Sequence, residues 1–130
     1  MRSRDDVEFL QSHLEMFTPV RSFPALVGFL TGAQWADPEF LNRFQAFVSA
    51  ELTGSLSLVW SASICERALG AEASQRVLQG AGTAEEHGLA IEAVFDAVAE
   101  YFVFAEEGRL DDVAARYERM RSSGGSSSDG

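Results

Sequence analysis

Three carboxylates at four-residue spacing, Glu92, Asp96 and Glu100, are the side chains of this sequence best placed to act together. Paired carboxylates can serve as general acid and general base when burial or a close like charge shifts a pKa toward neutrality. A helix is expected here, and on it the three share one face opposite an apolar stripe. They are therefore expected to point into solvent, and we predict that they do not catalyse a reaction and that the protein is not an enzyme.

These carboxylates belong to a strongly acidic segment. Between residues 85 and 112 nine carboxylates accompany a single cation, Arg109, so this segment carries −8 of the chain's net charge of −10. Like charges at i, i+4 destabilise a helix by roughly 0.2–0.5 kcal/mol per pair, a penalty that solubility alone does not require. The segment is either a solvated helix face or a docking surface for a cationic partner. Its acids are Glu85, Glu86, Glu92, Asp96, Glu100, Glu106, Glu107, Asp111 and Asp112.

The docking interpretation selects six residues as a partner-binding site. Val103 falls among the acids on a helical wheel and is the expected apolar anchor of the interface. The alternative is that Val103 and its neighbour Phe104 pack beneath the final helix. The predicted partner-binding residues are Glu92, Asp96, Glu100, Val103, Glu106 and Glu107.

Composition narrows the class of partner. An isoelectric point near 4.5 disfavours nucleic acids and anionic membranes, which would repel the protein, and favours a basic protein. The single cysteine cannot form an intrachain disulfide, and the start of the chain shows no signal-peptide pattern, so a cytoplasmic location is expected. No apolar stretch reaches the length of a membrane span.

The sequence does not contain the complete residue pattern of a metal site, an activated cysteine nucleophile or a phosphate-binding loop. Neither His13 nor His87 has a glutamate three residues before it, as a di-iron bundle would need, and His87 is expected at the surface. Cys65 has no basic neighbours that would activate it and is expected to be a buried structural thiol. The glycines before Thr83 are not expected to bind phosphate, because no strand precedes them and no lysine accompanies them. They are expected to form a hinge. No cofactor or metal is therefore expected.

The apolar spacing predicts an all-α protein, a small antiparallel bundle of about five or six helices in a single domain over residues 1–121. Asp37 and Pro38 form a favourable helix start, and Phe40, Phe44 and Phe47 define the buried face of the helix that follows. Residues 122–130 are expected to be a flexible Ser/Gly-rich tail. The expected helices cover residues 5–17, 25–31, 37–52, 55–69, 73–78, 83–107 and 110–121.

The start of the longest expected helix is well defined by its sequence, whereas the secondary structure of Ser55–Ile64 is ambiguous. Thr83 with Glu86 forms a capping-box pattern at the start of the most periodic helix, which Gly108 ends. Ser55–Ile64 alternates serine with apolar residues, as a strand does, but it also fits a helical face and has no strand to pair with, so a helix is expected. The expected buried face of the long helix consists of Ile91, Val94, Phe95, Val98, Tyr101, Phe102 and Ala105.

Two stretches of the chain resemble the colicin D-like immunity proteins of bacteriocin systems. The stretches are FLTGAQWADPEFLNRF (Phe29–Phe44) and IEAVFDAVAEYF followed by Leu110-Asp111-Asp112. The resemblance implies a small acidic helical protein that covers the cationic active site of a toxic nuclease. A different class of function is also open: a structural subunit forming a homodimer, in which the many phenylalanines partly serve an intersubunit surface.

Overall fold

The computed structural model describes residues 4–14, 22–32 and 38–128, which form helices and connecting turns without a strand. The all-α prediction is therefore confirmed, with seven α-helices and one π-helical segment in these ranges. None of the described helices is both long and apolar enough to cross a membrane. The elements are α1 (Arg4–Ser12), α3 (Phe23–Gly32), α4 (Pro38–Phe47), η1 (Val48–Thr53), α5 (Trp60–Leu69), α6 (Ala71–Leu78), α7 (Ala84–Glu106) and α8 (Leu110–Ser128).

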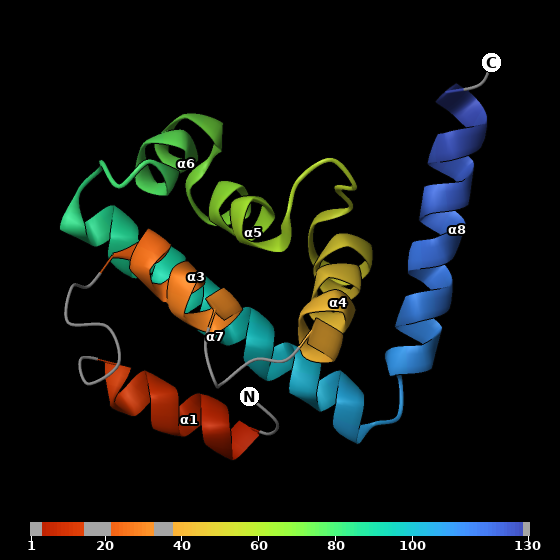
Figure 1. Cartoon of the computed structure of the whole chain (residues 1–130), viewed down its shortest axis with the longest axis horizontal. Helices are drawn as coiled ribbons and strands as arrows, with labels where there is room; N and C mark the ends of the chain where they lie inside the picture. The colour runs from red at the N-terminus through yellow and green to blue at the C-terminus, as the bar shows by residue number, and fades with distance from the viewer. Residues whose placement is uncertain (1–3, 15–21, 33–37, 129–130) are drawn as a thin grey trace.

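Helix α7 forms the axis of the bundle and contacts α1, α3, α4, α5 and α6 (Figure 1). Its predicted apolar face is confirmed except at Ala105, which is only half-buried. Each large apolar side chain buried in this way contributes about 1.5–3 kcal/mol, so packing rather than intrinsic propensity holds the helix in place. The buried side chains of α7 are His87, Ala90, Ile91, Val94, Phe95, Ala97, Val98, Tyr101 and Phe102.

An aromatic cluster joins α4 to α7. The rings of Phe40, Phe44 and Phe47 on α4 surround Tyr101 of α7 with centroid distances of 5.3, 5.9 and 5.8 Å, all in edge-to-face geometry. Such pairs add about 0.5–1.5 kcal/mol each to the burial of their area. The predicted core face of α4 is therefore confirmed, although Asp37, the expected N-cap, lies outside the described residues.

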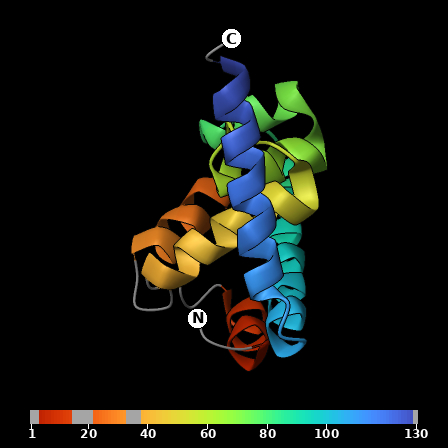
Figure 2. The ribbon, with the colours of Figure 1, turned by 90° about the vertical axis from the view of Figure 1, so that its right-hand side faces the viewer.

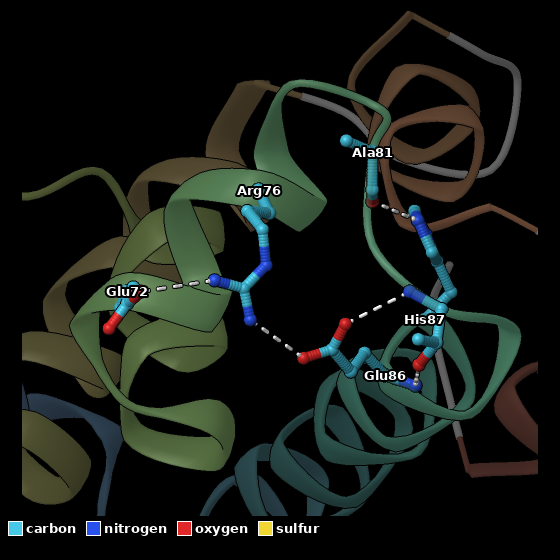
Figure 3. A network of polar contacts seen from close by, with 6 residues as sticks. Glu72, Arg76, Ala81, Glu86 and His87 are labelled. Atoms are coloured by element: carbon cyan, nitrogen blue, oxygen red, sulfur yellow. Dashed lines mark hydrogen bonds and ion pairs between the residues drawn. The ribbon is translucent and has the colours of Figure 1, made fainter.

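The turn between α6 and α7 is fixed by the predicted capping box, which the structure confirms (Figure 3). The Glu86 N–H donates to Thr83 Oγ1 (3.1 Å), and the Thr83 N–H donates to Glu86 Oε1 (2.9 Å). The other carboxylate oxygen of Glu86 accepts from Arg76 of α6 (3.2 Å), and Arg76 also pairs with Glu72 (3.5 Å). Two free N–H groups at the helix start are satisfied, and α6 is tied to α7.

His87 was expected at the surface, and that prediction is wrong, because the side chain is buried and links three segments. Its Nδ1 accepts the backbone N–H of Phe23 at the start of α3 (3.0 Å), which assigns the ring proton to Nε2. The Nε2–H then donates to the Ala81 carbonyl in the turn before α7 (2.7 Å), as Figure 3 shows. The first N–H of a helix has no partner within the helix, and here the imidazole supplies one.

The segment between α4 and α5 departs from the expected helices. The predicted helix to Leu52 changes at Val48 to π-helical turns and ends at Gly54, whose φ of 71° is left-handed. Ser55–Val59 is an irregular connection rather than a helix, and α5 begins only at Trp60. The side chain of Gln45 stabilises this start, because its Oε1 accepts the Trp60 N–H (2.6 Å) and its Nε2 donates to the Leu58 carbonyl (3.4 Å).

The ends of the chain also differ from expectation. Helix α1 ends at Ser12, and the remainder of the helix predicted to Phe17 falls partly outside the described residues. Helix α8 continues to Ser128, so residues 122–128, expected to be a flexible tail, have helical backbone. No proline follows Arg121 to interrupt the hydrogen bonds, although serine and glycine have low helix propensity.

Replacing His87 by leucine should lower the free energy of unfolding by about 1–3 kcal/mol, because it leaves the Phe23 N–H buried without a partner and removes the bond to the more accessible Ala81 carbonyl. Urea denaturation followed by circular dichroism measures this change. The matched control is His13→Leu, since His13 is exposed and its Nδ1 bonds to the Phe9 carbonyl one turn earlier; it should change stability by less than about 0.5 kcal/mol. Equal effects of the two substitutions would contradict the linking role of His87.

The capping box should make stability depend on acid pH. The Thr83 N–H, and after it Arg76, hold the pKa of Glu86 below its usual value of 4.5. Because the folded state favours the ionised form of this carboxyl group, its ionisation stabilises the fold. This stabilisation is complete above the unfolded-state pKa and is lost as the pH falls through the folded-state pKa. The difference in melting temperature between wild type and Glu86→Gln should therefore be larger at pH 7 than at low pH. A difference that stays constant on acidification would show that the carboxylate charge of Glu86 contributes nothing.

Candidate functional site

The three aligned carboxylates lie on the outer face of α7. Glu92, Asp96 and Glu100 are exposed and follow one another at one-turn intervals, opposite the buried stripe. In the described parts of the chain, none of the three forms an ion pair with an arginine or histidine. Their charges repel one another along the helix and are free to meet an external cation.

The other two predicted acids are already engaged within the protein. Glu106 pairs with Arg4 of α1 (3.4 Å), and Glu107 pairs with Arg109 in the turn after α7 (3.1 Å). Both pairs are exposed, so each contributes little to stability, but each reduces the charge offered to a partner. The structure thus separates the predicted site into an unpaired set on α7 and a paired set at the C-terminal end of the helix.

Val103 and Phe104 also have different roles. The Phe104 ring packs edge-to-face on Phe47 (5.1 Å between centroids), and the Arg109 guanidinium lies 4.0 Å above it. Phe104 therefore packs internally, against α4 and the turn before α8. Val103 is half-buried and is not part of the described core cluster, so part of its surface remains accessible.

Asp96 and Glu100 form one wall of a groove between α5 and α7. The groove has a volume of about 270 Å³. Small and branched apolar side chains form its floor, and Arg67 of α5 stands opposite the acids. We call this hollow the α5–α7 groove; it is lined by Leu52, Ile64, Arg67, Ala68, Ala93, Asp96, Ala97 and Glu100.

A second hollow adjoins the α5–α7 groove, because Leu52 and Arg67 line both. This second hollow, of about 490 Å³, lies against the irregular connection between η1 and α5 and is rich in serine hydroxyls. The same connection exposes two apolar side chains, Leu56 (43%) and Val59 (57%).

The π-helical segment η1 holds this surface together. Thr53 Oγ1 accepts the Ser55 N–H (3.2 Å) and lies 2.7 Å from Ser63 Oγ, so the connection is tied to α5. On the other side Gln45 Nε2 donates to Ser49 Oγ (2.9 Å), a buried hydroxyl of η1. Widened turns of this kind often occur at functional sites.

Two kinds of reactive site, a metal cluster and an activated thiol, can be examined directly in the described residues. No group of three or more histidine, cysteine or acidic side chains is close enough there to hold a metal ion. The Cys65 thiol is buried, as expected, and burial raises its pKa above 9.0, which keeps it in the unreactive neutral form.

Sequence reasoning found the acids but missed the residues across the groove from them. Leu52 and Arg67 come from η1 and α5, and no spacing along the chain links them to α7. Comparison with known proteins adds no candidate: no family model matches the chain, and no curated protein or solved structure is significantly similar to it.

Proposed function

We propose that this protein is a non-catalytic binding module that docks a basic surface of another protein against the α5–α7 groove. The observation that carries the proposal is the set of three exposed, unpaired carboxylates on α7, two of which line a groove with an apolar floor. A basic side chain could lay its aliphatic stem on that floor while its charged end meets Asp96 and Glu100.

The mechanism we propose combines steering with apolar contact. The field of an acidic face accelerates the encounter with a cationic partner, whereas the release rate depends on apolar anchors that are covered in the complex. Leu56 and Val59 are candidate anchors beside the groove, and Val103 is a further candidate one turn beyond Glu100. Glu106 and Glu107 would take a smaller part, because Arg4 and Arg109 already neutralise them.

The resemblance to colicin D-like immunity proteins suggests a specific form of this function. In that form the partner would be a toxic nuclease, and the carboxylates on α7 would occupy the cationic site that otherwise binds nucleic acid phosphates. The interaction would take place in the cytoplasm and need no cofactor, nucleic acid or membrane.

The alternative function, a homodimeric structural subunit, was expected to use the phenylalanines as part of its intersubunit surface. Phe40, Phe44 and Phe47 are buried in the core of the protomer itself. The phenylalanine-rich face of α4 therefore cannot also cover a second subunit.

A synthetic octa-arginine peptide can test the proposed site. In NMR titrations it should shift the amide signals of Ala93, Asp96 and Ala97, and its affinity should fall steeply between about 20 mM and about 200 mM salt. Neutralising the site with Glu92→Gln, Asp96→Asn and Glu100→Gln should weaken binding about tenfold, because three exposed charge pairs supply roughly 1–2 kcal/mol together.

The control neutralises three exposed acids elsewhere, with the substitutions Asp5→Asn, Glu8→Gln and Glu85→Gln. It removes the same net charge but leaves the groove intact, so it should weaken binding much less. Equal weakening by both triple variants would mean that only overall charge matters, and the proposed site would be wrong.

A further inference from the structure

Helix α8 is supported on one side only. It contacts α4 and η1, and Figures 1 and 2 show it running along one edge of the bundle. Val113 is its one buried side chain among residues 110–123, while Leu110, Tyr117 and Met120 are half-buried. An ion pair between Arg116 and Glu51 of η1 adds to this attachment. Most of the helix surface is therefore left for another contact.

An open groove of about 350 Å³ separates α8 from α4. Its apolar part is formed by Ala46 of α4 and by Val113, Ala114 and Tyr117 of α8. Arg43 and Arg121 stand at its edges, and each has one carboxylate within its own helix, Glu39 (2.8 Å) and Glu118 (3.4 Å). We call this hollow the α4–α8 groove. It shares no lining residue with the α5–α7 groove.

The charges of α8 are divided along its length. Residues 110–115 contain Asp111 and Asp112 and no cation, which gives −2. Residues 116–121 contain three arginines and Glu118, which gives +2. This is the densest group of cations in a chain that otherwise repels copies of itself. A helix that is acidic at one end and basic at the other is complementary to itself in antiparallel orientation.

We propose that the α4–α8 groove binds α8 of a second copy of this chain, in a symmetric antiparallel dimer. Ala114, Glu118 and Arg121 line the groove. Asp111 continues the same stripe of α8 just outside the groove, because the four residues follow one another at steps of three, four and three. In the antiparallel register that centres this stripe, Asp111 meets the partner's Arg121, and the small side chain of Ala114 allows close approach opposite the partner's Glu118. A twofold axis repeats both contacts.

Charge reversal tests this register in the full-length protein. Sedimentation velocity at low salt should show a monomer–dimer equilibrium for the wild type. Asp111→Arg alone and Arg121→Glu alone should each raise the dimer dissociation constant by about tenfold, because each places like charges in both symmetric contacts. An equimolar mixture of the two variants should restore dimers, since each chain then supplies the charge that the other lacks.

Controls separate this result from loss of folding. Glu8→Arg changes charge equally but lies on α1, away from the groove, and should leave the dimer intact. Ala114→Glu at an exposed position should abolish the dimer, because it places a like charge opposite the partner's Glu118 in both symmetric contacts, while circular dichroism and the melting temperature remain those of the wild type. A wild type that stays monomeric at all concentrations, or a dimer indifferent to Asp111→Arg, Arg121→Glu and Ala114→Glu, would overturn the proposal. Because the two grooves are separate, either result leaves the octa-arginine test of the α5–α7 groove unaffected.

Discussion

Burial of one face of α7 is the constraint on which the rest of this structure depends. Five helices pack against α7, so its apolar stripe is the common floor of the core. A helix buried on one side must expose the other, and residues at one-turn intervals on that side form a continuous row. The positions of Glu92, Asp96 and Glu100 therefore follow from the core, while their chemical type does not. The core would tolerate lysine, glutamine or alanine at all three.

Polar contacts fix the N-terminal end of α7. The capping box of Thr83 and Glu86 fixes where the helix begins, and His87 in the next position fastens it to the start of α3. Further along α7, the helical period places Asp96 and Glu100 on the exposed side, where they line the α5–α7 groove together with residues of α5.

The sequence identifies features whose physical cause is local. The capping box, the apolar stripe of α7 and the stop at Gly108 each depend on residues within a few positions of one another, and the structure confirms all three. His87 and the Ser55–Val59 connection were predicted wrongly because their conformations depend on distant partners, the Phe23 N–H and the Gln45 side chain. The candidate site divides in the same way: the row of acids is visible in the sequence, whereas Arg67 and Leu52 opposite it are brought there by the fold.

The central claim is that the outer acids of α7 do not hold the fold together and are free to serve binding. The most direct test is the free energy of unfolding in urea, at low salt, of the variant in which Glu92, Asp96 and Glu100 are all neutralised. This variant should be as stable as the wild type, or more stable by up to about 1 kcal/mol, because two like-charge contacts are removed. A loss of more than about 1 kcal/mol would contradict it, since the carboxylates would then be structural.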